Sequence, residues 1–141
     1  MNFYDEVDDN LLKFAVIIVK TEDKYVFCKH KDRNTWEVPG AHRETEEIIL
    51  DTAKRELYEE TGAVDFDIQP VFGYSVIAKE KDNFNGQERF GMLYYADIKS
   101  FETELQSEIE KIIITDKQLK EWTYPEIQPK LMEEVKKRGI I

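Results

Sequence analysis

Cysteine is nearly absent from this sequence, and positive charge is scarce. Cys28 is the only cysteine in 141 residues. A disulfide within the chain is therefore excluded, and no cysteine spacing of the zinc or redox type exists. We expect Cys28 to be a small core residue, because free cysteines are usually buried. Lys and Arg number 20 against 30 Asp and Glu, so the net charge is -10. This charge argues against a protein that binds nucleic acid polymers, which needs basic groups to pair with phosphates.

Long hydrophobic runs are also missing. The longest aliphatic run near the N-terminus, Phe14 to Val19, is far too short to span a bilayer. The acidic stretch Met1 to Asn10 has no apolar region of the signal-peptide kind. We therefore expect a cytoplasmic protein with no membrane partner. The length and the 41% hydrophobic content predict one globular domain over residues 1–141.

The first half of the chain predicts strands followed by a helix. The β-branched run Lys13 to Lys20 is typical of a buried strand, and a turn at Glu22-Asp23 leads to a partner strand, Lys24 to His30. The remaining predictions here are a short strand at Trp36 to Val38, stopped by Pro39-Gly40, and a helix from about Glu46 to Thr61, with Gly62 at its end.

The second half predicts more strands and two helices. Strands are expected at Val71 to Ala78, Glu88 to Ile98 and Ile109 to Ile114, with an Asn85-Gly86 turn between the first two. A short helix is predicted over Asp116 to Trp122. A C-terminal helix is predicted to begin at a capping box, Thr123 with Glu126 and Pro125 in the first turn, and to run to Lys137. This order of elements favours an α+β fold with mixed strand pairing.

Three glutamates on the first predicted helix are the candidate ligands for a metal ion. Glu56, Glu59 and Glu60 stand at i, i+3 and i+4, so their carboxylates converge on one face and repel one another. Glu56 and Glu60 lie along the edge of an apolar stripe, where burial of an unpaired charge is costly. A hard cation such as Mg²⁺ resolves both problems with oxygen ligands. The alternative, in a sequence rich in glutamate, is an ordinary solvated helix face.

The residues from Ala41 to Ala63 resemble the Nudix box. That signature reads Gly, five residues, Glu, seven residues, Arg-Glu, an aliphatic residue, any residue, Glu-Glu, any residue, Gly and an aliphatic residue. Glu47, Arg55, Glu56, Leu57, Glu59, Glu60 and Gly62 match it in register, whereas Ala41 replaces the first glycine. The lead-in Trp36 to Gly40 also resembles the family. If the backbone at position 41 needs a positive φ, alanine strains the loop there.

The resemblance implies a Nudix-type α/β/α sandwich with a mixed central sheet. It also implies Mg²⁺-dependent hydrolysis of a diphosphate bond in a nucleoside diphosphate linked to another group, such as a modified nucleoside triphosphate, with Mn²⁺ as an alternative ion. The implied metal ligands are Glu56, Glu59, Glu60, the carbonyl of Ala41 and a further carboxylate, Glu108, with Glu110 as the fallback. Arg55 and Glu47 are expected to form a supporting ion pair. Glu56 and Glu60 are the leading candidates for the general base.

Candidate substrate contacts follow the second strand and lie on later strands. Lys29 and Arg33 are candidates for phosphate contacts, although a basic surface turn explains them equally well. Tyr74 and Phe90 are candidates for stacking on a base, but aromatic residues in strands more often belong to the core. His30 and His42 show no metal-ligand spacing.

Two alternative functions remain on the same scaffold. The first is a catalytically weak or inactive ligand-binding or regulatory domain, which Ala41 favours and the complete glutamate set opposes. The second is an isopentenyl-diphosphate isomerase-like enzyme, which the short chain and the early position of Cys28 oppose. The sequence does not identify the diphosphate substrate. A homodimer is compatible with the resemblance, because dimers are common among relatives.

Overall fold

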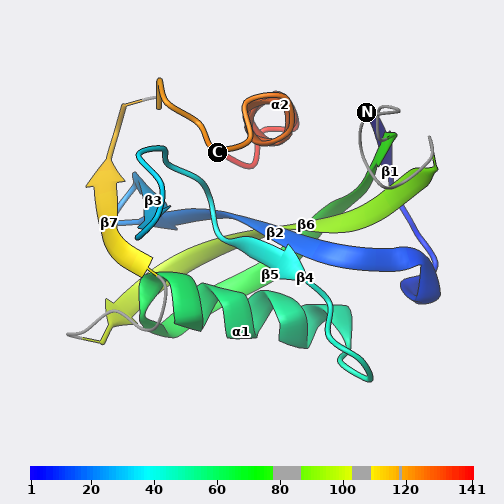
Figure 1. Ribbon diagram of the computed structural model, residues 1–141, viewed down its shortest axis with the longest axis horizontal. Helices are drawn as coiled ribbons and strands as arrows, with labels where there is room; N and C mark the ends of the chain where they lie inside the picture. Colours follow the sequence, from blue (N-terminus) through cyan, green and yellow to red (C-terminus); the bar gives the residue numbers. More distant parts are fainter. Residues whose placement is uncertain (78–86, 103–108, 118) are drawn as a thin grey trace.

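A seven-stranded mixed sheet lies between two helices in the computed structural model (Figure 1). The structure describes residues 1–77, 87–102, 109–117 and 119–141. Helix α1 covers one face of the sheet and α2 covers the other. The α+β sandwich expected from the sequence is confirmed. The strand order is β1-β5-β6-β2-β3-β7, with β4 also paired to β2. The elements are β1 (Asn2–Tyr4), the 3₁₀ turn η1 (Asp9–Leu11), β2 (Leu12–Thr21), β3 (Lys24–His30), β4 (Gly40–His42), α1 (Ile49–Thr61), β5 (Ala63–Ile77), β6 (Glu88–Phe101), β7 (Ile109–Thr115) and α2 (Gln128–Lys137).

Strand β2 is buried on both faces, which explains its continuous apolar sequence. Ala15, Ile17 and Val19 pack in the core on the α1 side, whereas Val16 and Ile18 pack on the α2 side. This division follows the two-residue alternation of a strand. β2 pairs in parallel with β6 and antiparallel with β3, so the predicted central strand and mixed sheet are confirmed.

One edge of β2 is shared by two partners, and this sharing opens the sheet. β3 pairs with β2 only through Tyr25 and Lys24 and then continues along β7. The chain that follows crosses the gap. Glu37 exchanges both backbone hydrogen bonds with Cys28 of β3, at 2.8 and 3.0 Å. Pro39 then accepts a backbone hydrogen bond from Ile17 of β2 at 2.9 Å, and β4 follows on β2. This crossing segment places a carboxylate between the two strands.

Helix α1 begins later than its sequence predicts. The expected start at Glu46 is wrong, because that residue has a left-handed backbone with φ of 66°. The helix instead runs from Ile49 to Thr61. Gly62 ends it with φ of 78° and donates its N–H to the carbonyl of Tyr58 at 2.8 Å, as a left-handed helix cap does.

The C-terminal predictions need two corrections. The described residues between Asp116 and Trp122 do not form the expected helix, because Trp122 makes a bridge to Trp36. The predicted capping box is also wrong. The hydroxyl of Thr123 lies 2.7 Å from that of Thr35, and α2 begins at Gln128 without a side-chain cap.

Several strands differ from their predicted bounds because pairing, rather than local pattern, decides them. β5 begins at Ala63 instead of Val71 and pairs with β6 along its length. Trp36 and Glu37 form isolated bridges, and the strand that follows them is β4, which begins at Gly40, inside the predicted Pro39-Gly40 stop. The expected Asn85-Gly86 turn lies outside the described residues. Within the described part of the chain, no helix has the length and apolarity that a membrane crossing requires.

Candidate active site

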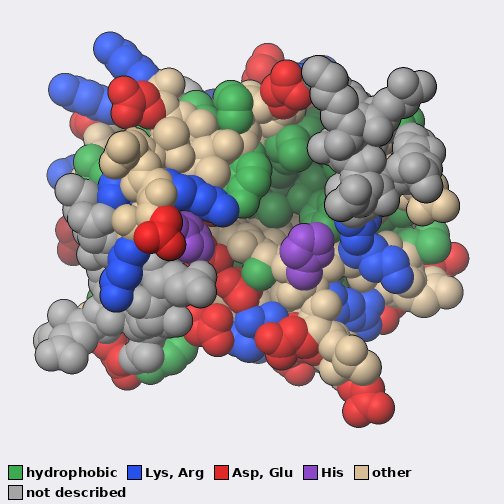
Figure 2. All heavy atoms as spheres, in the orientation of Figure 1, with side chains coloured by type: hydrophobic (Ala, Val, Ile, Leu, Met, Phe, Trp, Pro, Cys, Tyr) green, Lys and Arg blue, Asp and Glu red, His purple; other side chains and the backbone are tan. Residues whose placement is uncertain are grey.

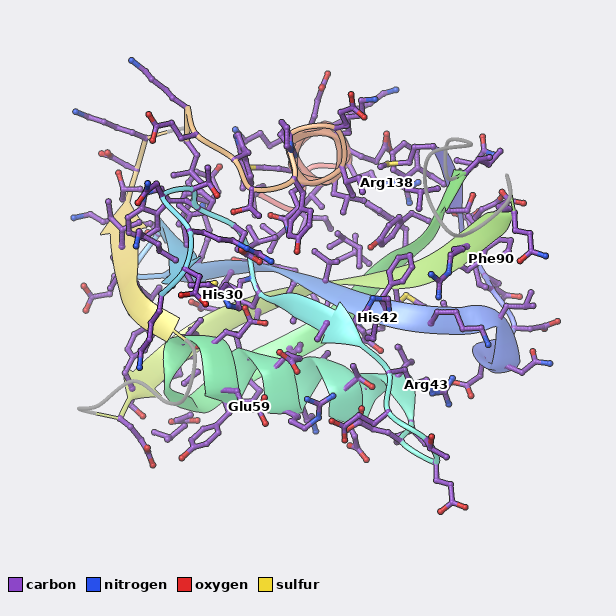
Figure 3. The ribbon with its side chains drawn as sticks, viewed as in Figure 1. His30, His42, Arg43, Glu59, Phe90 and Arg138 are labelled. Carbon is purple, nitrogen blue, oxygen red and sulfur yellow. The ribbon has the colours of Figure 1, made fainter. Side chains whose placement is uncertain are left out.

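The box glutamates lie on α1 at two different depths. Glu56 and Glu60 are buried, with 8% and 5% of their surfaces exposed. The side chain of Glu59 is 46% exposed, and Figure 3 shows it on α1. Ile49, Ala53 and Leu57 form the buried stripe of the helix. The predicted placement of Glu56 and Glu60 along the edge of that stripe is confirmed, and a simple solvated face is not what the structure shows for these two side chains.

Glu56 and Glu60 form a hydrogen-bonded pair of carboxyl groups. Burial, followed by a hydrogen bond to Glu60 and repulsion from its charge, raises the pKa of Glu56 to about 8. The guanidinium of Arg55, which is hydrogen-bonded to Glu56, opposes this shift. Burial and the neighbouring carboxylate thus favour the protonated form of Glu56 when no cation is bound.

Arg55 also holds the loop that precedes α1. Its Nε donates to Glu47 Oε2 at 2.8 Å and its Nη2 donates to Oε1 at 3.0 Å. The expected ion pair is thus present with bidentate geometry. Thr52 Oγ1 donates to Glu47 at 2.6 Å and the backbone N–H of Glu44 donates at 3.2 Å. These bonds, with that of Arg55 the strongest, lower the pKa of Glu47 to about 2, so its carboxylate stays charged.

Strand β4 brings backbone groups to the buried glutamates. The N–H of Gly40 donates to Glu60 Oε1 at 3.3 Å. A Cβ atom at Gly40 would lie 2.9 Å from the carbonyl oxygen of Ala15, so glycine is required there by close approach. Ala41 is opposite Ala15 in β4, and it is not among the described residues with a positive φ. The alanine therefore causes no left-handed strain.

Two side chains that sequence analysis did not connect to Glu60, one half-buried and one buried, also reach it. His30 Nε2 lies 3.4 Å from Glu60 Oε2 and 3.6 Å from Glu37 Oε2. Cys28 Sγ donates to Glu60 Oε2 at 3.4 Å. A hydrogen bond to Glu60 raises the pKa of His30, and burial raises the pKa of both Glu37 and the Cys28 thiol. The one sequence signal for this cluster was Glu37, a charged residue within the otherwise apolar segment from Trp36 to Gly40. Local spacing does not link that residue to β3.

A cavity of about 480 Å³ adjoins β4 on the α2 side of the sheet. Figure 2 shows this face hollowed and apolar beside a histidine, with acidic and basic side chains gathered toward α1. Figure 3 labels His42, one of the lining residues. The other lining residues are Phe14, Ala15, Val16, Gly40, Ala41, Tyr74, Val76, Arg89, Tyr124, Ile127 and Gln128. Gly40, which lines the cavity and donates to Glu60, thus connects the cavity to the glutamates.

The predicted substrate residues are not gathered together. Arg33 Nη1 donates to Glu37 Oε1 at 3.0 Å and to the Tyr124 hydroxyl at 3.3 Å, so it lies next to the cluster with its charge engaged. Strand alternation places Lys29 on the face opposite His30. Tyr74 is a buried core residue whose side chain borders the cavity. Phe90 lines a different cavity, with Tyr4 at 5.6 Å between ring centroids.

The last predicted metal ligand cannot be compared with this geometry. Glu108 lies outside the described residues, and so does the side chain of Glu110, its fallback. The side chains that the structure does bring together are hard oxygen donors, with one imidazole and backbone groups of β4 nearby. Such a set can hold a divalent cation and, beside an apolar cavity, can present a phosphate to it.

Comparison with known proteins finds matches in both sequence and fold. The family model described as the NUDIX domain matches residues 10–138. A Bacillus subtilis (strain 168) protein, YtkD, provisionally named an 8-oxo-dGTP diphosphatase, is 30% identical over 102 residues. The match covers 72% of this chain and spans 60% of the length of that relative.

Solved structures share the fold at low identity. The Bacillus subtilis pyrophosphohydrolase BsRppH superimposes with a TM-score of 0.77 at 22% identity, covering 98% of this chain and 89% of that one. The NUDIX domain of Shewanella oneidensis NrtR, solved with ADP ribose, has a TM-score of 0.65 at 18% identity, covering 90% and 87%. These likenesses concern the fold.

Proposed function

This chain belongs to the NUDIX domain family, and we propose that it is a hydrolase that uses Mg²⁺, or Mn²⁺ in its place, to cut a diphosphate bond. The proposed substrate is a nucleoside diphosphate linked to another group, such as a modified nucleoside triphosphate. The observation that carries the proposal is the buried Glu56–Glu60 pair, which faces backbone groups of β4 beside an apolar cavity.

The residues of the site fit a hard divalent cation. Two buried carboxyl groups share a hydrogen bond and disfavour full ionisation, as the raised pKa of Glu56 indicates. A cation in place of the shared proton would relieve this repulsion. Glu56, Glu59 and Glu60 are the proposed ligands, and the carbonyl of Ala41 is a further one. The bound ion would neutralise phosphate oxygens and lower the pKa of an attacking water.

The other residues have positioning roles in this proposal. Arg55 joins Glu56 to Glu47, and so fixes the start of α1 relative to the loop before it. Glu56 and Glu60 are the proposed candidates for the general base that accepts the proton of the attacking water, and the raised pKa of Glu56 favours proton uptake by that side chain. The cavity of about 480 Å³ is the proposed binding place of the nucleoside part.

Two comparisons support the substrate class. The YtkD relative carries the name of an 8-oxo-dGTP diphosphatase, and the NrtR domain was solved with ADP ribose. Both molecules contain a nucleoside diphosphate unit. The substitution of Ala41 for the first box glycine favoured a non-catalytic domain only if position 41 required a positive φ. Its backbone is not left-handed, so that support is weakened.

The test is a substrate panel assayed with Mg²⁺. It contains ordinary and oxidised nucleoside triphosphates, dinucleoside polyphosphates and nucleotide sugars, with phosphate and pyrophosphate release measured. We expect Glu56→Gln, Glu59→Gln and Glu60→Gln to lower kcat at least about a hundredfold on the best substrate. The matched control is Asp51→Asn, which removes an exposed carboxylate from the same helix. Equal inactivity of the wild-type protein and all variants across the panel would refute the proposal.

A further inference from the structure

A second group of possible ligand atoms lies between β3, the crossing segment and α1. His30 Nε2 and one oxygen each of Glu37 and Glu60 lie within 4.8 Å of one another. Both carboxylates are buried, with 4% and 6% of their side chains exposed, whereas that of His30 is 23% exposed. Figure 3 shows His30 above α1, apart from Glu59. The group is therefore buried at its base and reachable through the imidazole.

Each carboxylate in this group is oriented by a bond to its other oxygen. Arg33 donates to Glu37 Oε1 at 3.0 Å, and the backbone N–H of Gly40 donates to Glu60 Oε1 at 3.3 Å. Both Oε2 atoms are consequently turned toward His30. Outer hydrogen bonds of this kind fix the ligands of metal sites. The same arrangement without an ion is an imidazolium paired with two carboxylates, and that is the competing explanation.

Strand geometry explains why His30 reaches this position. β3 runs without interruption from Lys24 to His30, so Cys28 and His30 lie on the same face of the sheet. The bridge between Cys28 and Glu37 places both residues on the α1 face with His30 two residues farther along β3. The imidazole and the two carboxylates thus come from three segments that meet only in the folded chain.

The two separations from the imidazole are close to those in a tetrahedral site, and the two carboxylate oxygens lie within 4.8 Å of each other. His30 Nε2 lies 3.4 Å from Glu60 Oε2 and 3.6 Å from Glu37 Oε2. Ligand atoms about 2.0–2.2 Å from a tetrahedral zinc lie about 3.4 Å apart. Adjacent ligands of an octahedral magnesium lie about 3 Å apart, and magnesium prefers oxygen to imidazole. The nitrogen and the spacing both favour a borderline divalent ion.

We propose that His30, Glu37 and Glu60 form a second cation site, which takes Zn²⁺ or a similar borderline divalent ion and leaves a fourth position open. This inference deepens the proposed function, because Glu60 belongs to both ligand sets. An ion here would lie next to the box glutamates without depending on Glu56 or Glu59. Zn²⁺ and Mg²⁺ are then predicted to bind with different residue requirements.

Nitrogen-15 NMR of protein labelled at histidine tests the site directly, because the chain contains two histidines. We expect Zn²⁺ to shift the ring-nitrogen signals of one of them, and His30→Gln identifies which signals are lost. His42→Gln is the matched control and should retain the shifted signals. His30→Gln and Glu37→Gln should each weaken Zn²⁺ binding by more than about tenfold in calorimetry. Circular dichroism checks that each variant is folded.

The outcomes separate this inference from the proposed function. Unchanged His30 signals at saturating Zn²⁺, or unweakened Zn²⁺ binding in both variants, would overturn the second site and favour the imidazolium pair. Mg²⁺ binding and hydrolysis by the wild-type protein are measured in parallel with no Zn²⁺ present. If the wild-type protein neither bound Mg²⁺ nor hydrolysed any substrate, the proposed hydrolase would be refuted. A Zn²⁺-induced shift of the His30 signals would still support the second site.

Discussion

Arg55 holds Glu47 through two parallel hydrogen bonds of 2.8 and 3.0 Å. Lysine cannot reproduce this fork. Arg55→Lys should therefore lower the free energy of unfolding by about 1 kcal/mol, a modest value for lost charge-assisted hydrogen bonds. It should also reduce kcat by about tenfold or more, because the start of α1 loses its anchor. Urea unfolding and steady-state kinetics measure the two effects. Lys54→Arg, a change at the exposed neighbour on α1, is the control, and equal behaviour of both variants would contradict the anchoring role.

The pH dependence of the metal-free protein should follow Glu56. Its pKa rises from an ordinary 4.5 to about 8 on folding. Between these values the folded protein retains a proton that the unfolded chain has released, so the free energy of unfolding falls as the pH rises. Urea unfolding in EDTA at pH 5, 6.5 and 8 should show this decline, and Glu56→Gln should reduce its slope. An unchanged slope in the variant would show that Glu56 is ionised throughout.

Metal affinity should have the opposite pH dependence. Mg²⁺ binds the carboxylate form, and below about pH 8 each ion must displace the proton of Glu56. The dissociation constant should fall by up to about tenfold per pH unit between pH 6 and 8, and then level off. Calorimetry in buffers of different ionisation enthalpy would detect the released proton. Binding that is independent of pH over this range would contradict the prediction.

Glycine should be required at position 40 and dispensable at position 41. A Cβ at Gly40 meets the Ala15 carbonyl at 2.9 Å and Val16 Cγ2 at 3.1 Å. Gly40→Ala should therefore cost about 1–3 kcal/mol of stability through overpacking. Ala41→Gly should preserve or raise turnover. It should lower the free energy of unfolding by at most about 1 kcal/mol, because glycine gives the unfolded chain more conformational entropy. Thermal unfolding and steady-state kinetics of the two variants measure these effects. A large loss of turnover in Ala41→Gly would contradict the prediction for position 41.

Gln128 should stabilise the crossing segment. Its buried amide accepts from the N–H of Val38 at 2.9 Å and donates to the Val38 carbonyl at 3.3 Å. Gln128→Leu leaves two buried backbone groups without these partners and should lower the free energy of unfolding by about 2 kcal/mol or more. Gln69→Leu, at an exposed position of β5, provides the comparison in urea unfolding. A similar small effect of both changes would show that water replaces the amide.

The sequence predicted the elements whose signals are local. The apolar run of β2, the turn at Glu22-Asp23 and the stripe of α1 are each contained in one segment. β1 escaped prediction because its acidic surroundings carry no strand pattern, and it exists through pairing with β5. The helix expected over Asp116 to Trp122 does not form, because Trp122 makes a bridge to Trp36, 86 positions earlier in the chain. No local pattern reveals such a pairing.

The site divides in the same way. Helical spacing was enough to place Glu56 beside Glu60, and the box register was enough to pair Arg55 with Glu47. His30 and Glu37 were not connected to Glu60, because their meeting depends on β3 leaving β2 and on the chain crossing back between them. Phe90 was a candidate for base stacking on residue type alone. Its position on β6 instead places it in the lining of a cavity other than the one beside β4.

The sharing of one edge of β2 by two partners has a consequence for how such a protein can diverge. Among the described residues, the side chains found to contact Glu60 come from the stretch between Cys28 and Glu60. Much of the facing wall of the cavity, with Val76, Arg89 and Ile127, comes from later segments. Under the proposed function, substitutions in that wall would change which molecule is recognised without disturbing the acidic centre. The proposed chemistry and the proposed recognition would then be inherited on separate pieces of the chain, and selection could act on one while the other stays constant.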